Sequence, residues 1–134
     1  MITQSECNEV ADFVVENCNG LYLVNDHAHI AAYAYLHSVY GTLMVVKNEG
    51  DIISICRWNM ITPTHAKILD FIVRPDFRHK FIAKNMFIKA KMAMPQLKTI
   101  SFHRKKYAMR SSSYLLDRWI KEKSHGRKLC TIGN

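Results

Sequence analysis

Glycine and proline, the residues that most often interrupt regular structure, are scarce: the chain has five glycines and three prolines in 134 residues. Hydrophobic residues make up 49% of it. A chain this rich in apolar residues and this poor in breakers folds around a core rather than staying disordered. Its length suits one core, and no linker, repeat or low-complexity stretch divides it. We expect a single domain over residues 1–134, with a loose basic tail from about residue 125.

Redox, targeting and membrane signals are also missing. The cysteines form no C-x-x-C pair, no basic-then-apolar leader opens the chain, and no apolar run is long enough to span a membrane. These absences predict reduced intracellular thiols that mostly fill the core, a cytoplasmic location and no membrane partner. The four cysteines are Cys7, Cys18, Cys56 and Cys130.

Acidic residues are few beyond the first third of the chain. Residues 1–51 contain seven acids and one lysine, a net charge of about −6; because the whole chain carries +8, residues 52–134 carry about +14. This asymmetry indicates an anionic partner for the second part, either a phosphate-bearing cofactor or nucleic acid. The alternative is a basic surface that is simply solvated.

The chain opens with a well-marked helix. Thr3 and Glu6 have the spacing of a capping box, apolar residues then recur at helical spacing, and Asn19-Gly20 is a stop signal. After a short apolar stretch, Asn25 is predicted to cap a second helix over residues 26–40, which Gly41 ends. The second helix is apolar on broad faces, so we expect it to be sandwiched between other elements.

The period then changes to that of strands. Residues 42–46, 52–61 and 67–73 are predicted strands, joined by the turns NEGD at 48–51 and TPTH at 62–65. Three consecutive strands with short turns form an antiparallel meander.

A third helix is predicted over residues 79–94, where Pro95 stops it, and a fourth strand over residues 98–104. A strand, a helix and a strand form a crossover, and crossovers join parallel strands. The fold class is therefore α+β: a mixed sheet, made of an antiparallel meander and a parallel crossover, with two N-terminal helices and one central helix. Residues 114–123 are predicted to form either a short helix or a final strand.

Between the third strand and the third helix, residues 73–78 read Val-Arg-Pro-Asp-Phe-Arg. This stretch resembles the central motif of the GNAT superfamily of N-acetyltransferases, in which a strand ends in Val-x-Pro and an aromatic residue and an arginine precede a glycine-rich turn that opens a helix. The resemblance covers about residues 42–107, and the two N-terminal helices by order only; the usual first strand is not obvious. It implies transfer of an acetyl group from acetyl-coenzyme A to an amine.

In the family, backbone N–H groups of this turn point at the cofactor pyrophosphate, and glycines let the backbone come close. Here Phe81 stands at the middle glycine, where a benzyl group meets the approaching diphosphate, whereas Arg78, Lys80 and Lys84 still suit phosphate. The two alternatives are a turn that binds acetyl-coenzyme A and a groove plugged by Phe81. The resemblance implies cofactor contacts at Ile72, Val73, Arg78, His79, Lys80, Phe81, Ile82, Ala83 and Lys84.

The resemblance also implies a carboxylate on the third strand as the base, acting directly or through water, and a tyrosine after the fourth strand as the acid. Asp70 is the only carboxylate in that strand, and Tyr107 and Tyr114 follow the fourth strand. The alternatives are an exposed strand aspartate and tyrosines that only pack. The acceptor amine, of a small molecule, a protein lysine or a protein N-terminus, is expected beside the N-terminal helices. Acids that suit a cation there are Glu9, Glu16 and Asp26.

Two other patterns suggest ligands. His27 and His29 lie two residues apart on a helix, which points their rings about 200° apart, so with His37 they predict no metal site. The segment Arg104–Lys123 interleaves basic and aromatic residues, as in nucleic-acid contacts.

A second hypothesis keeps the fold without catalysis: a binding protein for a host protein or nucleic acid, or a virion component. Small GNAT-like proteins with eroded glycine turns resemble those of bacteriophages, which would place the chain in the host cytoplasm. Nothing in the sequence indicates an oligomeric state.

Overall fold

The computed structural model describes residues 2–17, 26–78, 81–104 and 107–124, with the side chains of residues 103–114 and 121–124 left out of the description. One five-stranded sheet runs in the order β1-β2-β3-β4-β5, and only the β3–β4 pairing is parallel. This confirms the α+β mixed sheet. The elements are α1 (Gln4–Asn17), α2 (His27–Val39), β1 (Leu43–Asn48), β2 (Asp51–Thr62), β3 (His65–Val73), a 3₁₀ turn (Pro75–Phe77), α3 (Ile82–Ala93), β4 (Thr99–Arg104), β5 (Tyr107–Leu115) and α4 (Leu116–Ser124).

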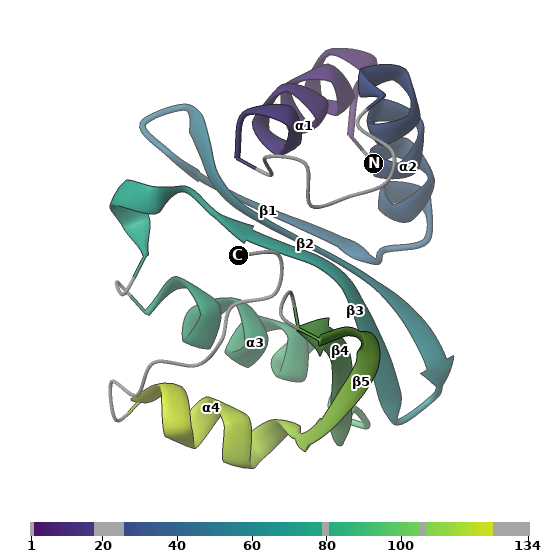
Figure 1. The fold of residues 1–134 in the computed structure, drawn as a ribbon, viewed down its shortest axis with the longest axis vertical. Helices are drawn as coiled ribbons and strands as arrows, with labels where there is room; N and C mark the ends of the chain where they lie inside the picture. Colours follow the sequence, from purple (N-terminus) through teal and green to yellow (C-terminus); the bar gives the residue numbers. More distant parts are fainter. Residues whose placement is uncertain (1, 18–25, 79–80, 105–106, 125–134) are drawn as a thin grey trace.

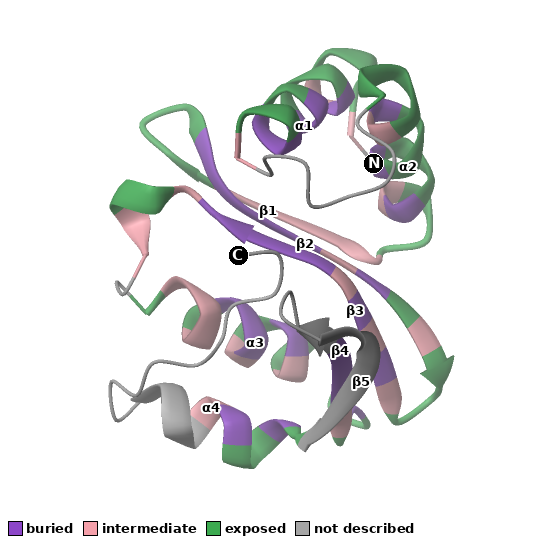
Figure 2. Ribbon diagram, viewed as in Figure 1, coloured by how far each residue is buried: buried purple, intermediate pink, exposed green. Residues whose placement is uncertain are grey.

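The helices cover both faces of the sheet. Figure 1 shows α1 and α2 on one side and α3 and α4 on the other. Each side has its own core: one joins α1 and α2 to Ile52, Ile55 and Ile72, and the other joins α3 and α4 to the opposite face of the strands. Figure 2 shows buried residues along the strands and on the inner sides of the helices. Strand residues alternate between the two cores because successive side chains point to opposite faces.

The capping box at the start of α1 is confirmed. The Thr3 N–H donates to Glu6 Oε1 at 3.2 Å, and the Glu6 N–H donates to Thr3 Oγ1 at 3.1 Å. These bonds satisfy N–H groups that the first helical turn leaves without partners. Buried residues then recur along one face of α1: Cys7, Val10, Ala11, Phe13 and Val14.

Two expectations for α2 are wrong. Its N-cap is Asp26, whose Oδ1 accepts from the Ala28 N–H at 3.0 Å, while Asn25 lies outside the described residues. The helix is also not sandwiched, because its large apolar side chains face outward and Tyr40, directly after it, is 74% exposed. The buried positions are Ala31, Ala34 and His37, so mainly small residues approach the sheet.

The meander and the hairpin turn at 48–51 are confirmed. Asn48 pairs with Asp51, and the two residues between them, Glu49 and Gly50, have φ of 52° and 86°. Positive φ at both central residues is typical of the two-residue turns that match strand twist.

The predicted crossover is confirmed, with shifted bounds: α3 begins at Ile82, after Phe81 as its N-cap, and ends at Ala93. Beyond it the sequence prediction was incomplete. The strand β5, antiparallel to β4, was not foreseen; it ends at Leu115, and α4 begins at Leu116, so both alternatives for residues 114–123 are partly right. The basic tail from residue 125 lies outside the described residues.

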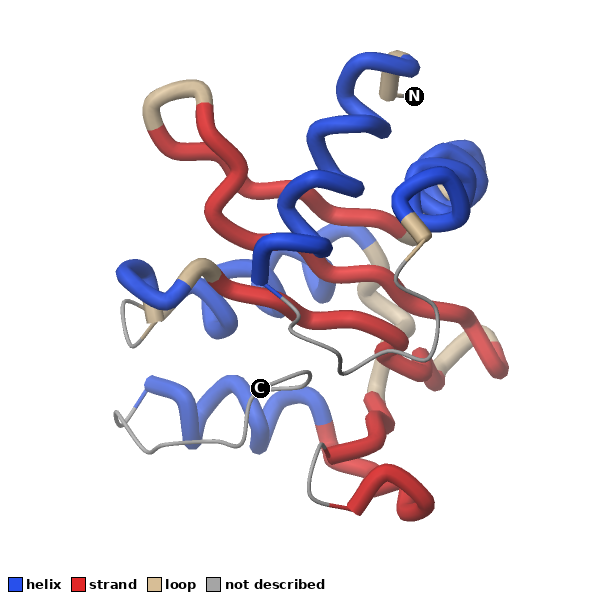
Figure 3. The backbone as a smooth tube through the Cα atoms, turned by 45° about the horizontal axis from the view of Figure 1, so that its top comes forward, coloured by secondary structure: helices blue, strands red, loops and turns tan. Residues whose placement is uncertain are grey.

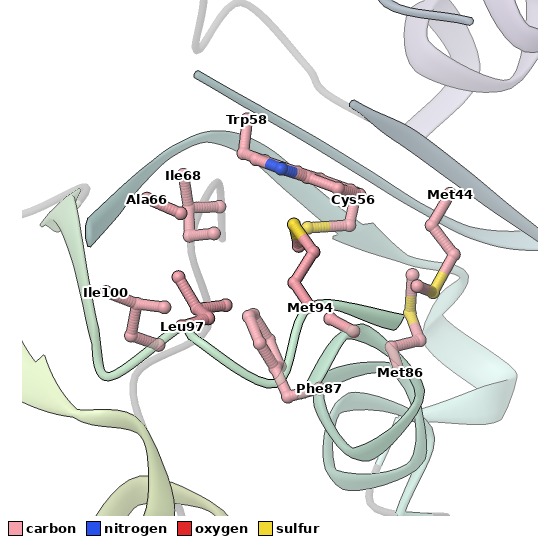
Figure 4. Close-up of a pocket in the computed structure, with 11 residues that line it drawn as sticks. Met44, Cys56, Trp58, Ala66, Ile68, Met86, Phe87, Met94, Leu97 and Ile100 are labelled. Carbon is pink, nitrogen blue, oxygen red and sulfur yellow. The ribbon is translucent and has the colours of Figure 1, made fainter. Parts of the chain in front are cut away.

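The core under α3 is tightly packed. A small void lies there between α3 and the sheet, lined among others by Trp58 and Met94, and it offers only about 10 Å³ (Figure 4). Such a space holds at most one water molecule. Trp58 and Trp119 are both buried and belong to this core. None of the helices in the described ranges is both long and apolar enough to cross a membrane.

Phe87 lies in this core between two other aromatic residues, so substituting it tests the packing. Its ring stacks on Phe71 at 5.6 Å and meets Trp119 edge-on at 4.5 Å. We expect Phe87→Ala to lower the free energy of unfolding by about 3–5 kcal/mol, through lost burial and the cavity left behind. Urea denaturation checks this. Met92→Ala, at a residue 76% exposed, should change the value by no more than about 0.5 kcal/mol; equal losses would contradict the packing described.

Candidate active site

The strands β3 and β4 pair over a short distance only. His65, Ala66 and Lys67 pair with Thr99, Ile100 and Ser101, and no later residue of β3 has a partner in β4 in the described part of the chain. The His65 ring nitrogens bond Thr99 Oγ1 at 2.5 Å and Ser101 Oγ at 2.9 Å, which fastens this end. Figure 3 shows the β4–β5 hairpin meeting β3 at this end.

A β-bulge lies where the pairing stops. Arg57 pairs with Asp70 and Trp58 with Ile68, so Leu69 is an extra residue in β3. A bulge bends its strand and redirects the side chains around it. Leu69 and Asp70 accordingly both line the same groove, on the α1–α2 side of the sheet.

The register also shows which backbone groups face the open edge of β3. The Arg74 N–H donates to Ile53 O at 2.8 Å, so Arg74 and Ile53 form a hydrogen-bonded pair. Because such pairs alternate along antiparallel strands, Ile72 directs its backbone groups toward β2, and Phe71 and Val73 direct theirs to the opposite edge. Sequence reasoning proposed Ile72 and Val73 as cofactor contacts, which stays a prediction, whereas the register directs the backbone groups of Phe71 and Val73 to this edge.

The basic turn follows the end of β3 in the chain. Arg78 Nε donates to the Val73 carbonyl at 3.1 Å, which holds this arginine against the end of β3. Arg74 is occupied differently: its guanidinium donates twice to Asp76, at 2.7 and 3.0 Å, and lies over the Phe77 ring. Of the two arginines in the motif, Arg78 is therefore the one placed beside the open edge.

Phe81 adopts a backbone conformation that glycine takes most readily. It has φ 59° and ψ 22°, in the left-handed region, and its ring is 50% exposed with Lys84 Nζ 5.7 Å from the ring centroid. This one residue thus has a backbone conformation that costs glycine little, although its side chain is large. Among the described residues no side chain caps α3, and the Asn85 N–H donates to the Phe81 carbonyl at 3.0 Å, so the N–H groups of the turn before Asn85 suit an anion.

The predicted cofactor contacts Ile82, Ala83 and Lys84 form that first turn and are partly exposed. His79 and Lys80 lie outside the described residues. The proposed acids, Tyr107 and Tyr114, lie in β5 opposite Arg104 and Ile100. Their side chains fall outside the description, as do most of those in the Arg104–Lys123 segment. These assignments stay predictions.

Asp70 is not an exposed strand residue, so that alternative is wrong. It is 7% exposed, and its Oδ2 accepts from Arg57 Nε at 2.5 Å. Arg57 also lies over the Tyr33 ring, with Cζ 5.0 Å from the centroid. Sequence reasoning missed this partner, although one basic and one acidic residue in neighbouring apolar strands is a signal for such a pair.

His37 extends the pair toward α2. Its Nε2 lies 3.4 Å from an Arg57 terminal nitrogen, and its Nδ1 lies 2.7 Å from Thr42 Oγ1. Burial, and then the positive charge of Arg57, hold the pKa of His37 below its ordinary value. The other two histidines bond separate carboxylates, His27 to Asp12 and His29 to Asp26, and no group of three metal-binding side chains is found within the described ranges.

Asp70, Arg57 and His37 line an open groove of about 490 Å³ between the N-terminal helices and the sheet. The acids proposed for a cationic acceptor do not line it: Glu9 contacts Lys47, and Asp26 caps α2. The lining residues are Val10, Val14, Ile30, Tyr33, Ala34, Leu36, His37, Leu43, Ile55, Arg57, Asn59, Leu69 and Asp70.

A family model described as the acetyltransferase (GNAT) family matches residues 8–111. The chain belongs to this family. The comparison with curated proteins gives no match.

Solved structures agree with this assignment at the level of fold. A GNAT-like decarboxylase, GphF, in complex with isobutyryl-CoA, is 12% identical over 75% of this chain and 62% of its own, with a TM-score of 0.56. Ard1 from Thermoplasma volcanium is 18% identical, covering 72% and 66%, with a TM-score of 0.55. PaiA N-acetyltransferase from Thermoplasma acidophilum, in complex with coenzyme A, is 12% identical, covering 76% and 75%, with a TM-score of 0.56. The chain thus spans less than two thirds of the length of the GphF and Ard1 chains.

The lowered pKa of His37 predicts that the stability of the folded chain depends on pH. On acidification, the unfolded chain protonates this imidazole at its ordinary pKa, before the folded chain does, so stability is lost as the pH falls below about 6.5. We expect His37→Gln, which cannot titrate, to lose less stability than wild type between about pH 7 and pH 5. Urea midpoints measured across this range check it. Parallel curves for the two proteins would contradict a buried neutral His37.

Proposed function

We propose that this chain is an N-acetyltransferase that moves an acetyl group from acetyl-coenzyme A to a primary amine. The observation that carries the proposal is the open edge of β3 beyond Lys67, which leads to the Arg78 turn and the start of α3. The GphF and PaiA structures, whose folds are similar, were determined with a coenzyme A ligand or an acyl derivative of it.

The residues around this edge fit such a cofactor. The backbone groups of Phe71 and the Val73 N–H offer an extended amide chain hydrogen bonds that another strand would make, while the Val73 carbonyl already accepts from Arg78. The first N–H groups of α3 and the cations of Arg78 and Lys84 suit a diphosphate. When bound, acetyl-coenzyme A supplies the acetyl thioester, an acyl group with a good leaving thiolate.

The groove residues would bind the acceptor amine and remove a proton from it. Asp70 lines the groove next to the bulge, where β3 leaves β4, so an amine in the groove approaches the open edge from the α1–α2 side. We assign Asp70 as the group that takes a proton from the amine, directly or through water. Tyr107 or Tyr114 is assigned to return a proton to the leaving thiolate.

Titration calorimetry with acetyl-coenzyme A tests the cofactor site. We expect wild type to bind, and Phe81→Gly to bind more tightly, because glycine removes the ring and relaxes the left-handed backbone. Phe81→Gly should also gain up to about 1 kcal/mol of stability. The matched control is Glu49→Gly, at the other non-glycine residue with positive φ among those described, in the β1–β2 hairpin. It should gain stability without changing affinity.

Absence of binding in wild type with binding by Phe81→Gly would support the inactive alternative, a fold plugged at this residue. Absence of binding in both would refute the acetyltransferase proposal.

Asp70→Asn tests the assigned base. We expect the release of free coenzyme A thiol, assayed with phenethylamine, spermidine and an alanine-initiated peptide, to fall about 10²–10⁴-fold. Affinity for acetyl-coenzyme A should stay unchanged, because Asp70 faces the groove rather than the open edge. Asp12→Asn, which removes an exposed carboxylate bonded to His27, is the control and should keep the wild-type rate. A wild-type rate in Asp70→Asn would sink the assignment.

A further inference from the structure

Four side chains form a continuous hydrogen-bonded network from the end of α2 to β3. Thr42 bonds His37, His37 contacts Arg57, and Arg57 holds Asp70. We call these residues the Asp70 network. Three different elements supply them: α2, β2 and β3, with Thr42 just before β1. Its members lie far apart in sequence, so the fold has to bring them together.

The direction of each hydrogen bond can be derived. Thr42 Oγ1 lies 3.3 Å from the His37 carbonyl, to which it donates its proton. We infer that it accepts at 2.7 Å from His37 Nδ1, which then carries the ring proton. Nε2 is left with its lone pair, and its neighbour at 3.4 Å is an Arg57 nitrogen, which can only donate. The depressed pKa of His37, caused first by burial, agrees with a neutral ring.

Arg57 is thereby restrained on three sides. Its Nε bonds Asp70 Oδ2, a terminal nitrogen faces His37, and Tyr33 lies against its plane. The consequence for Asp70 is that one carboxylate oxygen is taken. The other, Oδ1, has no partner among the residues that the structure describes, and Asp70 lines the groove.

We propose that Arg57 and His37 are positioning residues that hold Asp70 with Oδ1 turned to the acceptor amine. This inference rests on the proposed function and adds to it a pH-dependent control of the same site. Arg57 and His37 touch neither the amine nor the cofactor. They act through the orientation of the Asp70 carboxylate.

The reaction balances with Asp70 in this role. The amine nitrogen forms a bond to the acetyl carbon while the carbon–sulfur bond breaks and its electron pair goes to sulfur. An ammonium acceptor loses two protons on becoming an amide: Asp70 Oδ1 takes one and passes it to solvent, and the thiolate ends with the other. Arg57 stays protonated throughout, because guanidinium does not titrate in proteins.

We expect protonation of His37 at acid pH to weaken the Asp70 network. The groups that face His37 are Thr42 before β1, Arg57 and the Trp58 backbone on β2, and Asp70 on β3. A second proton on the ring turns Nε2 from an acceptor into a donor and sets two cations side by side. Arg57 then loses one of its three restraints.

Nuclear magnetic resonance of the ¹⁵N-labelled full chain tests the network without any acceptor. We expect the His37 ring to carry its proton on Nδ1, and the Arg57 Nε–H to exchange slowly. His37→Leu and Thr42→Val should speed that exchange about tenfold or more, whereas His37→Gln, which keeps an acceptor, should not. Arg74, whose Nε also donates to a carboxylate but far from His37, is the internal control and should not respond. A ring proton on Nε2, or unchanged Arg57 exchange in both variants, would overturn the network.

Steady-state kinetics tests the effect on catalysis, with whichever of phenethylamine, spermidine and the alanine-initiated peptide releases most thiol. His37→Leu should lower kcat about tenfold while KM for acetyl-coenzyme A stays within about twofold. His37→Gln, the conservative variant, should restore most of the kcat that His37→Leu loses and should lose the fall in rate at acid pH. An unchanged kcat in His37→Leu would refute the positioning role. Wild type that binds no acetyl-coenzyme A would instead refute the proposed function, and the spectra would still decide whether the network exists.

Discussion

The short parallel contact between β3 and β4 is the constraint on which the rest of the site depends. Three residue pairs join the strands, and His65 fastens them through two hydroxyl groups. Had the pairing continued, the backbone of Phe71 and Val73 would be used inside the sheet. Because it stops, this edge of β3 has no neighbouring strand in the described part of the chain, and such edges bind extended chains. The bulge at Leu69 does two things at once: it lies where pairing stops, and it turns Asp70 toward the groove.

In the proposed reaction, the cofactor and the acceptor therefore approach β3 from different sides. The open edge leads to Arg78 and the first turn of α3, where positive charge and N–H groups gather. The α1–α2 face holds the groove with Asp70, whose charge Arg57 balances. At Phe81 the backbone has the left-handed conformation that glycine takes most readily, and the half-exposed residue lies against Lys84.

Local signals were enough to predict most of the architecture. The capping box, the hairpin turn and the crossover depend on neighbouring residues, and each is present. The orientation of α2 was not predictable, since its faces are similarly apolar and only contact with the sheet selects the alanine face. The strand β5 was missed because Tyr107–Leu115 has little apolar alternation. At the site, the turn and Asp70 were proposed from the resemblance, but Arg57, His37 and Phe71 were not, because their roles follow from the register that the bulge sets.

The Arg57–Asp70 pair is difficult to explain by stability alone. Burying two charges costs desolvation energy, and replacing a buried pair with apolar residues of similar size is often neutral or stabilising. The apolar residues around the pair, including Ile55 and Leu69, show that this face of the sheet accommodates such side chains. The pair also lines an open groove, so a ligand in the groove can reach its charges. A guanidinium that fixes the orientation of a carboxylate is useful where that carboxylate must meet a ligand, and it adds far less to holding strands together. The geometry thus favours a chemical reason for these two residues over a structural one.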